Sequence, residues 1–211
     1  MTGRPLPKGG LAVGHVIAAL TMSVDGFIAL EDDSVGHLFD WYDSGDVEVR
    51  WPGMGMVSHV APPSAGYLRR TIEEAGALVV GRRVYDYTNG WGGDHPLAVP
   101  VFLVTHHPPQ AWPAPDAPFT AVPEGVAAAI TMARAAAGDK AVALAGPSII
   151  QQALDLDLVD EIAVELAPVL LGRGIRFFGD LTHAPLLLDD PEITESSRVT
   201  HLRFRVRHRN G

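Results

Sequence analysis

The chain is organised around the stretch Gly76-Ala-Leu-Val-Val-Gly-Arg-Arg-Val-Tyr-Asp86. Its apolar run Ala77–Val80 is typical of a strand buried on both faces. Gly81 breaks the run, and Arg82 and Arg83 open a short helix predicted over residues 82–87. A buried strand, a glycine turn and a cationic helix start together present free N–H groups beside guanidinium donors, which suits a phosphate. A plain structural turn is the alternative, because Gly-Arg-Arg also occurs in surface turns.

The composition is that of an ordinary globular protein. The 211 residues are 47% hydrophobic and 19% charged, with a formal net charge of −9 at pH 7. An acidic chain suits neither nucleic acid nor an anionic membrane surface, so we expect neither as a partner. We also expect no membrane span and no signal peptide. There is no cysteine, which excludes disulfides and thiolate chemistry and fits a cytoplasmic protein.

Strand and helix patterns alternate through about residue 168. A helix is predicted from an N-cap at Ser64 to Ala75, ended by Gly76. Two antiparallel strands, 186–188 and 199–206, are predicted to close the chain. Buried or alternating strands are predicted at residues 16–22, 77–80, 99–104, 140–146 and 159–167. This order predicts a flexible tail over residues 1–14 and one α/β domain over residues 15–211. We expect three α/β/α layers around a mostly parallel sheet with antiparallel C-terminal strands.

Two surface features need a separate interpretation. Residues 31–66 form a long stretch rich in Asp, Gly and Pro, in which the runs His37–Tyr42 and Trp51–Met56 concentrate aromatic and Met side chains. Such runs either pack on the body of the domain or cover a substrate. Near the C-terminus, Arg203, Arg205 and Arg207 alternate with apolar residues. They are predicted to form the solvated face of an outer strand.

Three predicted strands end in residues that are suited to contact a phosphate. They lead into Gly81-Arg82-Arg83, into Thr105-His106, and into Gly146-Pro147-Ser148 at a helix start. Ligands of open α/β sheets bind at the carboxyl ends of the strands, so these termini predict a nucleotide with more than one phosphate. The Gly-x-Gly-x-x-Gly fingerprint of ordinary dinucleotide folds is absent. Adjacent His106 and His107 point apart in extended chain, so we expect no metal.

The order of these motifs resembles the dihydrofolate reductase-like superfamily. The run Ala19–Ala29 is similar to its first strand and loop, and Val79–Tyr85 to its Gly-Arg-x-Thr/Ser pyrophosphate turn. Leu158-Val-Asp-Glu161 and Ala167-Pro-Val-Leu-Leu-Gly-Arg-Gly174 resemble signatures of one branch, the reductase domain of bacterial riboflavin-biosynthesis deaminase/reductases. The resemblance extends from about residue 16 to residue 206.

The resemblance implies NADPH as cofactor, a small pterin- or pyrimidine-type substrate and a homodimer. It places Gly81, Arg82 and Arg83 at the pyrophosphate and the 2′-phosphate region. It also places Thr105 and His106 by the adenosine 2′-phosphate. Ala19 would meet the nicotinamide through its backbone. The residues implied to cradle phosphates at a helix N-terminus are Gly146, Pro147, Ser148 and Ile149.

The chain departs from the family at several points. Val84 replaces the hydroxyl residue of the phosphate turn, and Leu144-Ala145-Gly146 stands where riboflavin reductases have Glu-Gly-Gly. The zinc deaminase half is absent. We therefore expect an NADPH-dependent reductase of a small heterocyclic or carbonyl compound. The alternatives are 5-amino-6-(5-phosphoribosylamino)uracil reduction in riboflavin biosynthesis and a non-catalytic nucleotide-binding module.

Hydride transfer to a C=N or C=O bond needs a proton donor, and two carboxyl groups are candidates for catalysis. Glu165 shares a strand face with Glu161 and Ala163, so its side chain faces either solvent or a cleft. Asp25 follows the first strand. It either caps the turn at Gly26 or anchors a substrate or a loop.

Overall fold

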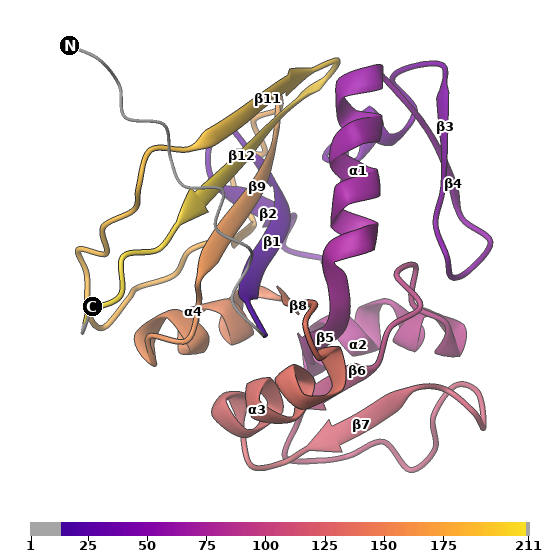
Figure 1. Ribbon diagram of the computed structural model, residues 1–211, viewed down its shortest axis with the longest axis vertical. Helices are drawn as coiled ribbons and strands as arrows, with labels where there is room; N and C mark the ends of the chain where they lie inside the picture. The colour runs from indigo at the N-terminus through magenta and orange to yellow at the C-terminus, as the bar shows by residue number, and fades with distance from the viewer. Residues whose placement is uncertain (1–13, 210–211) are drawn as a thin grey trace.

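The computed structural model describes residues 14–209, so the predicted tail lies almost entirely outside the described residues. An eight-stranded sheet in the order β11-β12-β9-β1-β8-β5-β6-β7 forms its centre (Figure 1). The strands are β1 (Val16–Ser23), β5 (Ala75–Gly81), β6 (Val101–Val104), β7 (Phe119–Val122), β8 (Ala141–Ala145), β9 (Glu161–Ala167), β11 (Glu192–Ser196) and β12 (Val199–Arg205). Strands β9, β1, β8, β5, β6 and β7 run parallel, and β12 is antiparallel to β9 and β11.

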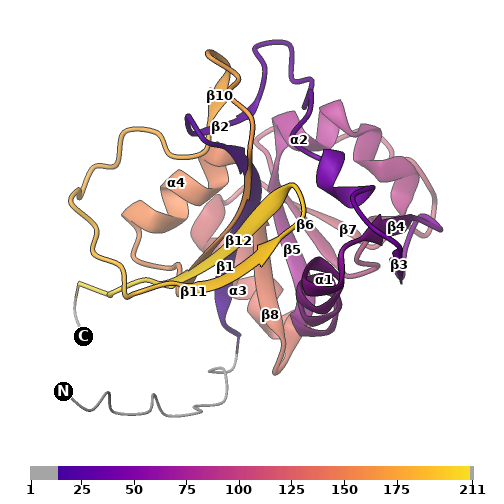
Figure 2. The same cartoon turned by 90° about the horizontal axis from the view of Figure 1, so that it is seen from above.

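Helices cover both faces of this sheet, which confirms the predicted three-layer architecture (Figure 2). They are α1 (Pro62–Glu74), α2 (Arg82–Tyr87), α3 (Val126–Ala137) and α4 (Pro147–Asp155). Successive side chains of each strand point to opposite faces of the sheet. Val16 and Ala18 pack in the main core with α3 and α4, whereas Ile17 faces the side of α1. None of the helices within residues 14–209 is both long and apolar enough to cross a membrane.

The remaining elements are short and lie outside the main sheet. They are β2 (Phe27–Ala29) paired with β10 (Ile175–Arg176), the hairpin β3 (Val47–Arg50) and β4 (Val57–Val60), and the 3₁₀ turns η1 (Asp40–Tyr42) and η2 (Asn89–Gly93). The segment 31–66 is therefore not one loop. It consists of η1, a hairpin and the start of α1.

Some predicted boundaries were wrong. Helix α1 begins two residues before Ser64, because Pro62 and Pro63 fit a first turn that lacks N–H partners. Ser64 is fully buried and does not cap the helix. Gly76 lies inside β5 instead of ending α1. The first C-terminal strand is β11, not residues 186–188. Leu188 contributes only an isolated bridge to Val206.

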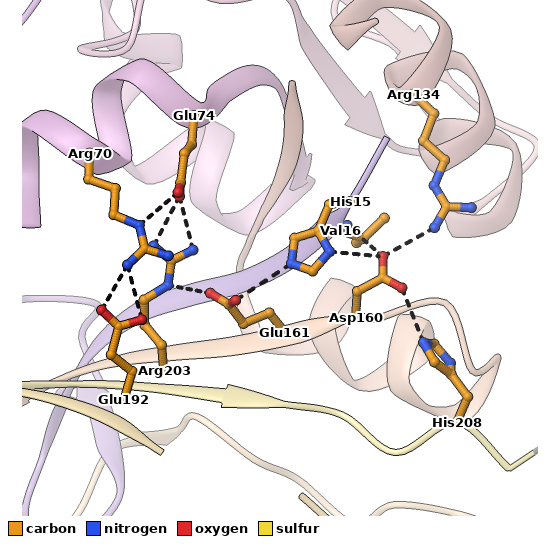
Figure 3. A network of polar contacts seen from close by, with 10 residues as sticks. All are labelled: His15, Val16, Arg70, Glu74, Arg134, Asp160, Glu161, Glu192, Arg203 and His208. Carbon is orange, nitrogen blue, oxygen red and sulfur yellow. Dashed lines mark hydrogen bonds and ion pairs between the residues drawn. The ribbon is translucent and has the colours of Figure 1, made fainter. Parts of the chain in front are cut away.

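A network of ion pairs joins β9, β11 and β12 to α1 (Figure 3). Arg203 donates to Glu161 of β9 and to Glu74 of α1, where its Nη1 and Nη2 lie 2.9 and 3.0 Å from Oε2. Arg70 extends the network, because it bonds to Glu74 at 2.7 Å and to Glu192 of β11 at 2.8 Å.

The prediction of a solvated arginine face was wrong for Arg203, which is only 7% exposed. Strand β12 is not an outer strand, because β11 pairs with its free edge and α1 covers the face that carries Arg203. Arg205 and Arg207 are exposed, as predicted. The sequence pattern could not separate these three arginines, because it does not identify the carboxylates that meet each of them.

Candidate functional site

A cleft with a volume of about 520 Å³ opens at the carboxyl ends of β1, β5 and β8. It forms because β1 and β8 diverge. Their pairing ends at Ala18 and Leu144, whereas β1 remains paired with β9 as far as Ser23. The residues that line the cleft come from β1, β2, the loop after β2, α2, α4 and β10. This is the edge where ligands bind in open α/β sheets.

One wall of the cleft is made by the starts of α2 and α4. Gly81, Gly146, Pro147 and Ser148 line it, and all four are predicted phosphate residues. Gly146 has a φ of +101°, and a Cβ there would lie 3.0 Å from the Val84 side chain. A side chain at Gly146 would therefore crowd Val84 in this wall of the cleft. The first N–H groups of α4 are left without helical partners, as at any helix start.

Ile149, which was also named for phosphate contacts, is 2% exposed and lies behind Gly81. A Cβ added to Gly81 would come within 3.1 Å of its Cγ1. Ile149 thus supports the wall from the core side. It does not line the cleft.

The two arginines of the organising stretch point to different places. Arg83 lines the cleft, and its Nε lies 2.6 Å from Asp33 Oδ1 in the loop after β2. Arg82 turns toward the end of β6, where its Nη1 donates to the His107 carbonyl at 2.8 Å. Thr105 Oγ1 bonds to the backbone of the same His107 at 3.2 Å. Arg82 and the residues 105–107 therefore form a cluster beside the cleft.

Ala19 lies just beyond the last β1–β8 pair, so its backbone is at the point of divergence. Its side chain does not line the cleft. It lines a separate cavity of about 40 Å³ under α1, together with Tyr67 and Arg203.

Glu165 lies on the α1 face of the sheet, directly behind a residue of the cleft wall. Its carboxylate accepts the Tyr67 hydroxyl at 2.7 Å and the Thr21 hydroxyl at 3.3 Å. Thr21 is 4% exposed and lines the cleft. Burial raises the pKa of Glu165 above its ordinary value, although the bonds from Tyr67 and Thr21 act in the opposite direction. This carboxyl group can therefore hold a proton next to the cleft.

Sequence reasoning missed Thr21 and Tyr67. Thr21 shares the strand face of Ile17 and Ala19, and Tyr67 fits the apolar stripe of α1. Their hydroxyl groups become significant only when β9 is placed next to β1. Burial and the neighbouring Glu165 raise the pKa of Tyr67 well above its ordinary value, so this phenol remains a hydrogen-bond donor.

Asp25, the other candidate acid, anchors a loop. Its carboxylate accepts the Ser23 hydroxyl at 2.6 Å and the N–H groups of Leu171 and Gly172 at 3.1 and 2.7 Å. The bond from Ser23 is the main cause that lowers the pKa of Asp25, and the bonds from Gly172 and Leu171 act in the same direction. Asp25 does not line the cleft.

The aromatic run 37–42 is divided between packing and the cleft. Trp41 is 1% exposed and belongs to a small core with Val60 and Leu68. Phe39, two residues earlier, lines the cleft. Trp51 packs at the β3–β4 hairpin, where its Nε1 donates to Ser58 at 2.9 Å.

A buried histidine next to Tyr67 provides a pH test of this part of the structure. His201 stacks on Tyr67 with ring centroids 3.9 Å apart, and its Nε2 lies 2.8 Å from Ser64 Oγ. Burial lowers its pKa to about 4. A histidine in the unfolded chain has a pKa of about 6.5. The contribution of neutral His201 to stability is therefore complete above about pH 6.5 and is lost as pH falls toward 4.

We expect His201 alone to lower the free energy of unfolding by about 3 kcal/mol between pH 6.5 and 4. Denaturant unfolding at several pH values should show a shallower dependence for His201→Phe than for the parent chain. His37→Phe is the control, because the His37 side chain is 78% exposed. Parallel curves for His201→Phe and the parent would contradict the buried, neutral state of His201.

Comparison with known proteins places this geometry in a structural class. No protein-family model and no curated protein sequence match the chain. Among solved structures, a proposed riboflavin biosynthesis protein from Shewanella sp. PV-4 is 22% identical, with a TM-score of 0.70 over 92% of this chain and 99% of that one. Dihydrofolate reductase from Enterococcus faecalis, complexed with NADP(H), is 14% identical, with a TM-score of 0.56 over 94% and 98%.

A deaminase/5-amino-6-(5-phosphoribosylamino)uracil reductase from Thermotoga maritima is 13% identical, with a TM-score of 0.60. The match covers 92% of this chain and 57% of that chain. At such identities the likeness concerns the fold. The chain has the three-layer fold of the dihydrofolate reductase-like reductases, as its sequence motifs predicted.

Proposed function

We propose that the chain is an NADPH-dependent reductase of a small heterocyclic or carbonyl compound. The observation that carries the proposal is the cleft, which combines two helix starts at Gly81 and Gly146 with a carboxyl group, Glu165, behind Thr21. The NADP(H) bound to the Enterococcus faecalis neighbour supports this choice of cofactor.

The wall made by α2 and α4 fits the phosphates of such a cofactor. Gly146 leaves space where a Cβ would meet Val84, and the start of α4 offers N–H groups to an anion. Arg83 adds a guanidinium group at the wall, and Arg82 with residues 105–107 would hold the 2′-phosphate. When bound, NADPH supplies the hydride for the substrate.

The chain's own residues supply the proton in this proposal. Thr21 donates its hydroxyl proton to the oxygen or nitrogen atom of the substrate that gains negative charge, and it regains a proton from Glu165. Tyr67 holds the carboxyl group in place through its 2.7 Å hydrogen bond. The raised pKa of Glu165 favours this role, because the acid form is the donor.

Titration with NADPH, followed by the fluorescence of the four tryptophans, tests the proposal. We expect saturable binding at micromolar cofactor and weaker binding of NADH. No saturable binding would overturn the proposal. Binding without oxidation of NADPH across a broad panel of carbonyl and heterocyclic compounds would instead support a non-catalytic nucleotide-binding module.

Arg82→Ala should weaken NADPH binding about tenfold and leave NADH binding unchanged, since a charge-assisted hydrogen bond contributes about 1.5–3 kcal/mol. The measurement is the ratio of the two dissociation constants by calorimetry. Arg69→Ala, on the exposed side of α1, is the matched control and should change neither constant. If Arg82→Ala kept the parent ratio, the 2′-phosphate would have to lie elsewhere.

A further inference from the structure

We propose that the substrate is an uncharged, largely apolar ring compound with one carbonyl or imine group that contacts Thr21, an inference that rests on the proposed function. It separates this chain from the Thermotoga maritima uracil reductase, whose substrate name includes a phosphoribosyl group. Three properties of the cleft lead to it.

The first property is an apolar wall of the cleft, which is separate from the wall made by the starts of α2 and α4. It comes from β1, β2, the loop after β2 and β10, whose parts are held together by the β2–β10 pairing (Figure 2). Its apolar members are Leu20, Ile28, Ala29, Val35, Phe39 and Ile175. Aliphatic side chains and one aromatic ring favour a flat, weakly hydrated ligand, because such a ligand loses little hydration on entry.

The second property is the charge of the cleft. Among the described residues that line it, only Asp33 and Arg83 are charged, and they pair with each other at 2.6 Å. Two further arginines occur near β10, but neither lines the cleft. The Arg173 side chain is 82% exposed, and Arg176 lies over the Phe27 ring at 4.8 Å from its centroid.

A substrate phosphate on the apolar wall would therefore lack a cation, and removing an unpaired charge from water costs several kcal/mol or more. Arg83 does not supply one, because it belongs to the wall assigned to the cofactor phosphates. The charge pattern thus disfavours a phosphorylated substrate.

The third property is a single uncharged polar side chain in the apolar wall. Among the described residues of this wall, only Thr21 and Asp33 have polar side chains, and Asp33 is paired with Arg83. With Glu165 protonated, the Thr21 hydroxyl can accept from the carboxyl group and donate to a ligand. One donor at a fixed place orients a ring through one carbonyl or imine group, and this is the group that the proposed reaction would reduce.

Two quinones that differ in charge test the inference. Menadione is a neutral bicyclic carbonyl compound, and 1,4-naphthoquinone-2-sulfonate carries an anionic group on a similar ring. The chain has no cysteine that these quinones could alkylate. We expect calorimetry on the protein, alone and saturated with NADP⁺, which cannot reduce the quinones, to show menadione binding at least tenfold more tightly than the sulfonate. Methyl NMR should locate menadione by shifts of Ile28, Val35 and Ile175.

A charge placed in the apolar wall should reverse this preference. Val35→Lys is expected to weaken menadione binding and to strengthen sulfonate binding. Ile175→Lys tests the same point from another segment. Val57→Lys is the control, because Val57 lies on β4 outside the cleft and is 36% exposed.

Equal or tighter binding of the sulfonate to the parent chain would overturn the inference, as would the absence of menadione shifts at the three methyl-bearing residues. If either result is found while NADPH binding is intact, only the inferred substrate class is overturned, and the proposed function stands. Menadione binding without NADPH binding would instead overturn the proposed function.

Discussion

Replacing Arg203 by methionine should lower the free energy of unfolding by about 3–5 kcal/mol, because the change leaves the buried carboxylate of Glu161 without its guanidinium partner. Glu161 and Glu74 both accept hydrogen bonds from Arg203, whose side chain is 6% exposed (Figure 3). Burial by itself would raise the pKa of Glu161, but His15 and Arg203 hold it below the ordinary value. Denaturant unfolding at pH 7 measures the effect.

Arg207→Met is the matched control for this substitution. Arg207 pairs with Asp189 at 2.6 Å, but its side chain is 59% exposed, so its loss should cost at most about 1 kcal/mol. Adding Glu161→Gln and Glu74→Gln to Arg203→Met should recover part of the lost stability, because the unpaired charges are removed. A cost for Arg203→Met no larger than that for Arg207→Met would contradict the role given to the network.

Glu165→Gln should lower turnover by about 10²–10⁴-fold, the usual contribution of general acid catalysis. Glutamine can keep one of the two hydrogen bonds through its single carbonyl oxygen, but its amide has no acidic proton to give. The parent rate should fall as pH rises through the raised pKa of Glu165, since the protonated form is the donor. The variant rate should lack this dependence. Steady-state kinetics with the carbonyl or heterocyclic compound that the parent turns over fastest measure both effects.

Two substitutions of Thr21 separate the role of its hydroxyl group from that of the Glu165 carboxyl group. Thr21→Val should lower turnover as Glu165→Gln does, whereas Thr21→Ser should retain most of it, and NADPH affinity should be unchanged in all three. Glu195→Gln on the exposed part of β11 is the control for charge and should have no effect. If Glu165→Gln kept the rate and pH profile of the parent chain, Glu165 would have no role as the proton donor.

The fold could be predicted where a residue's local pattern matches its final environment. Apolar runs such as Ala77–Val80 identified the central strands, because parallel strands are buried on both faces. Helix α2 spans the predicted residues 82–87. Strand β11 was missed because it is an edge strand whose residues are largely exposed, with Ile193 at 56%, so its sequence carries no hydrophobic signal.

The site could be predicted only in part. Turns such as Gly81–Arg83 and Gly146–Ser148 can be recognised in the sequence, because a glycine and a helix start are local features. The contact between Thr21 and Glu165 is not local, since 144 residues separate them and only the β1–β9 pairing brings them together. The same limit applies to Arg203, whose carboxylate partners lie on α1 and β9.

The most direct test of the account is a ¹H–¹⁵N NMR titration of the whole chain with NADPH. We predict saturable shifts of the amide signals of Gly81, Arg83, Gly146 and Ser148, together with Ala19 at the divergence of β1 and β8. Shifts confined to the α1 face around Glu74 and Arg203, or no saturable shifts at all, would contradict the assignment of this cleft to the cofactor.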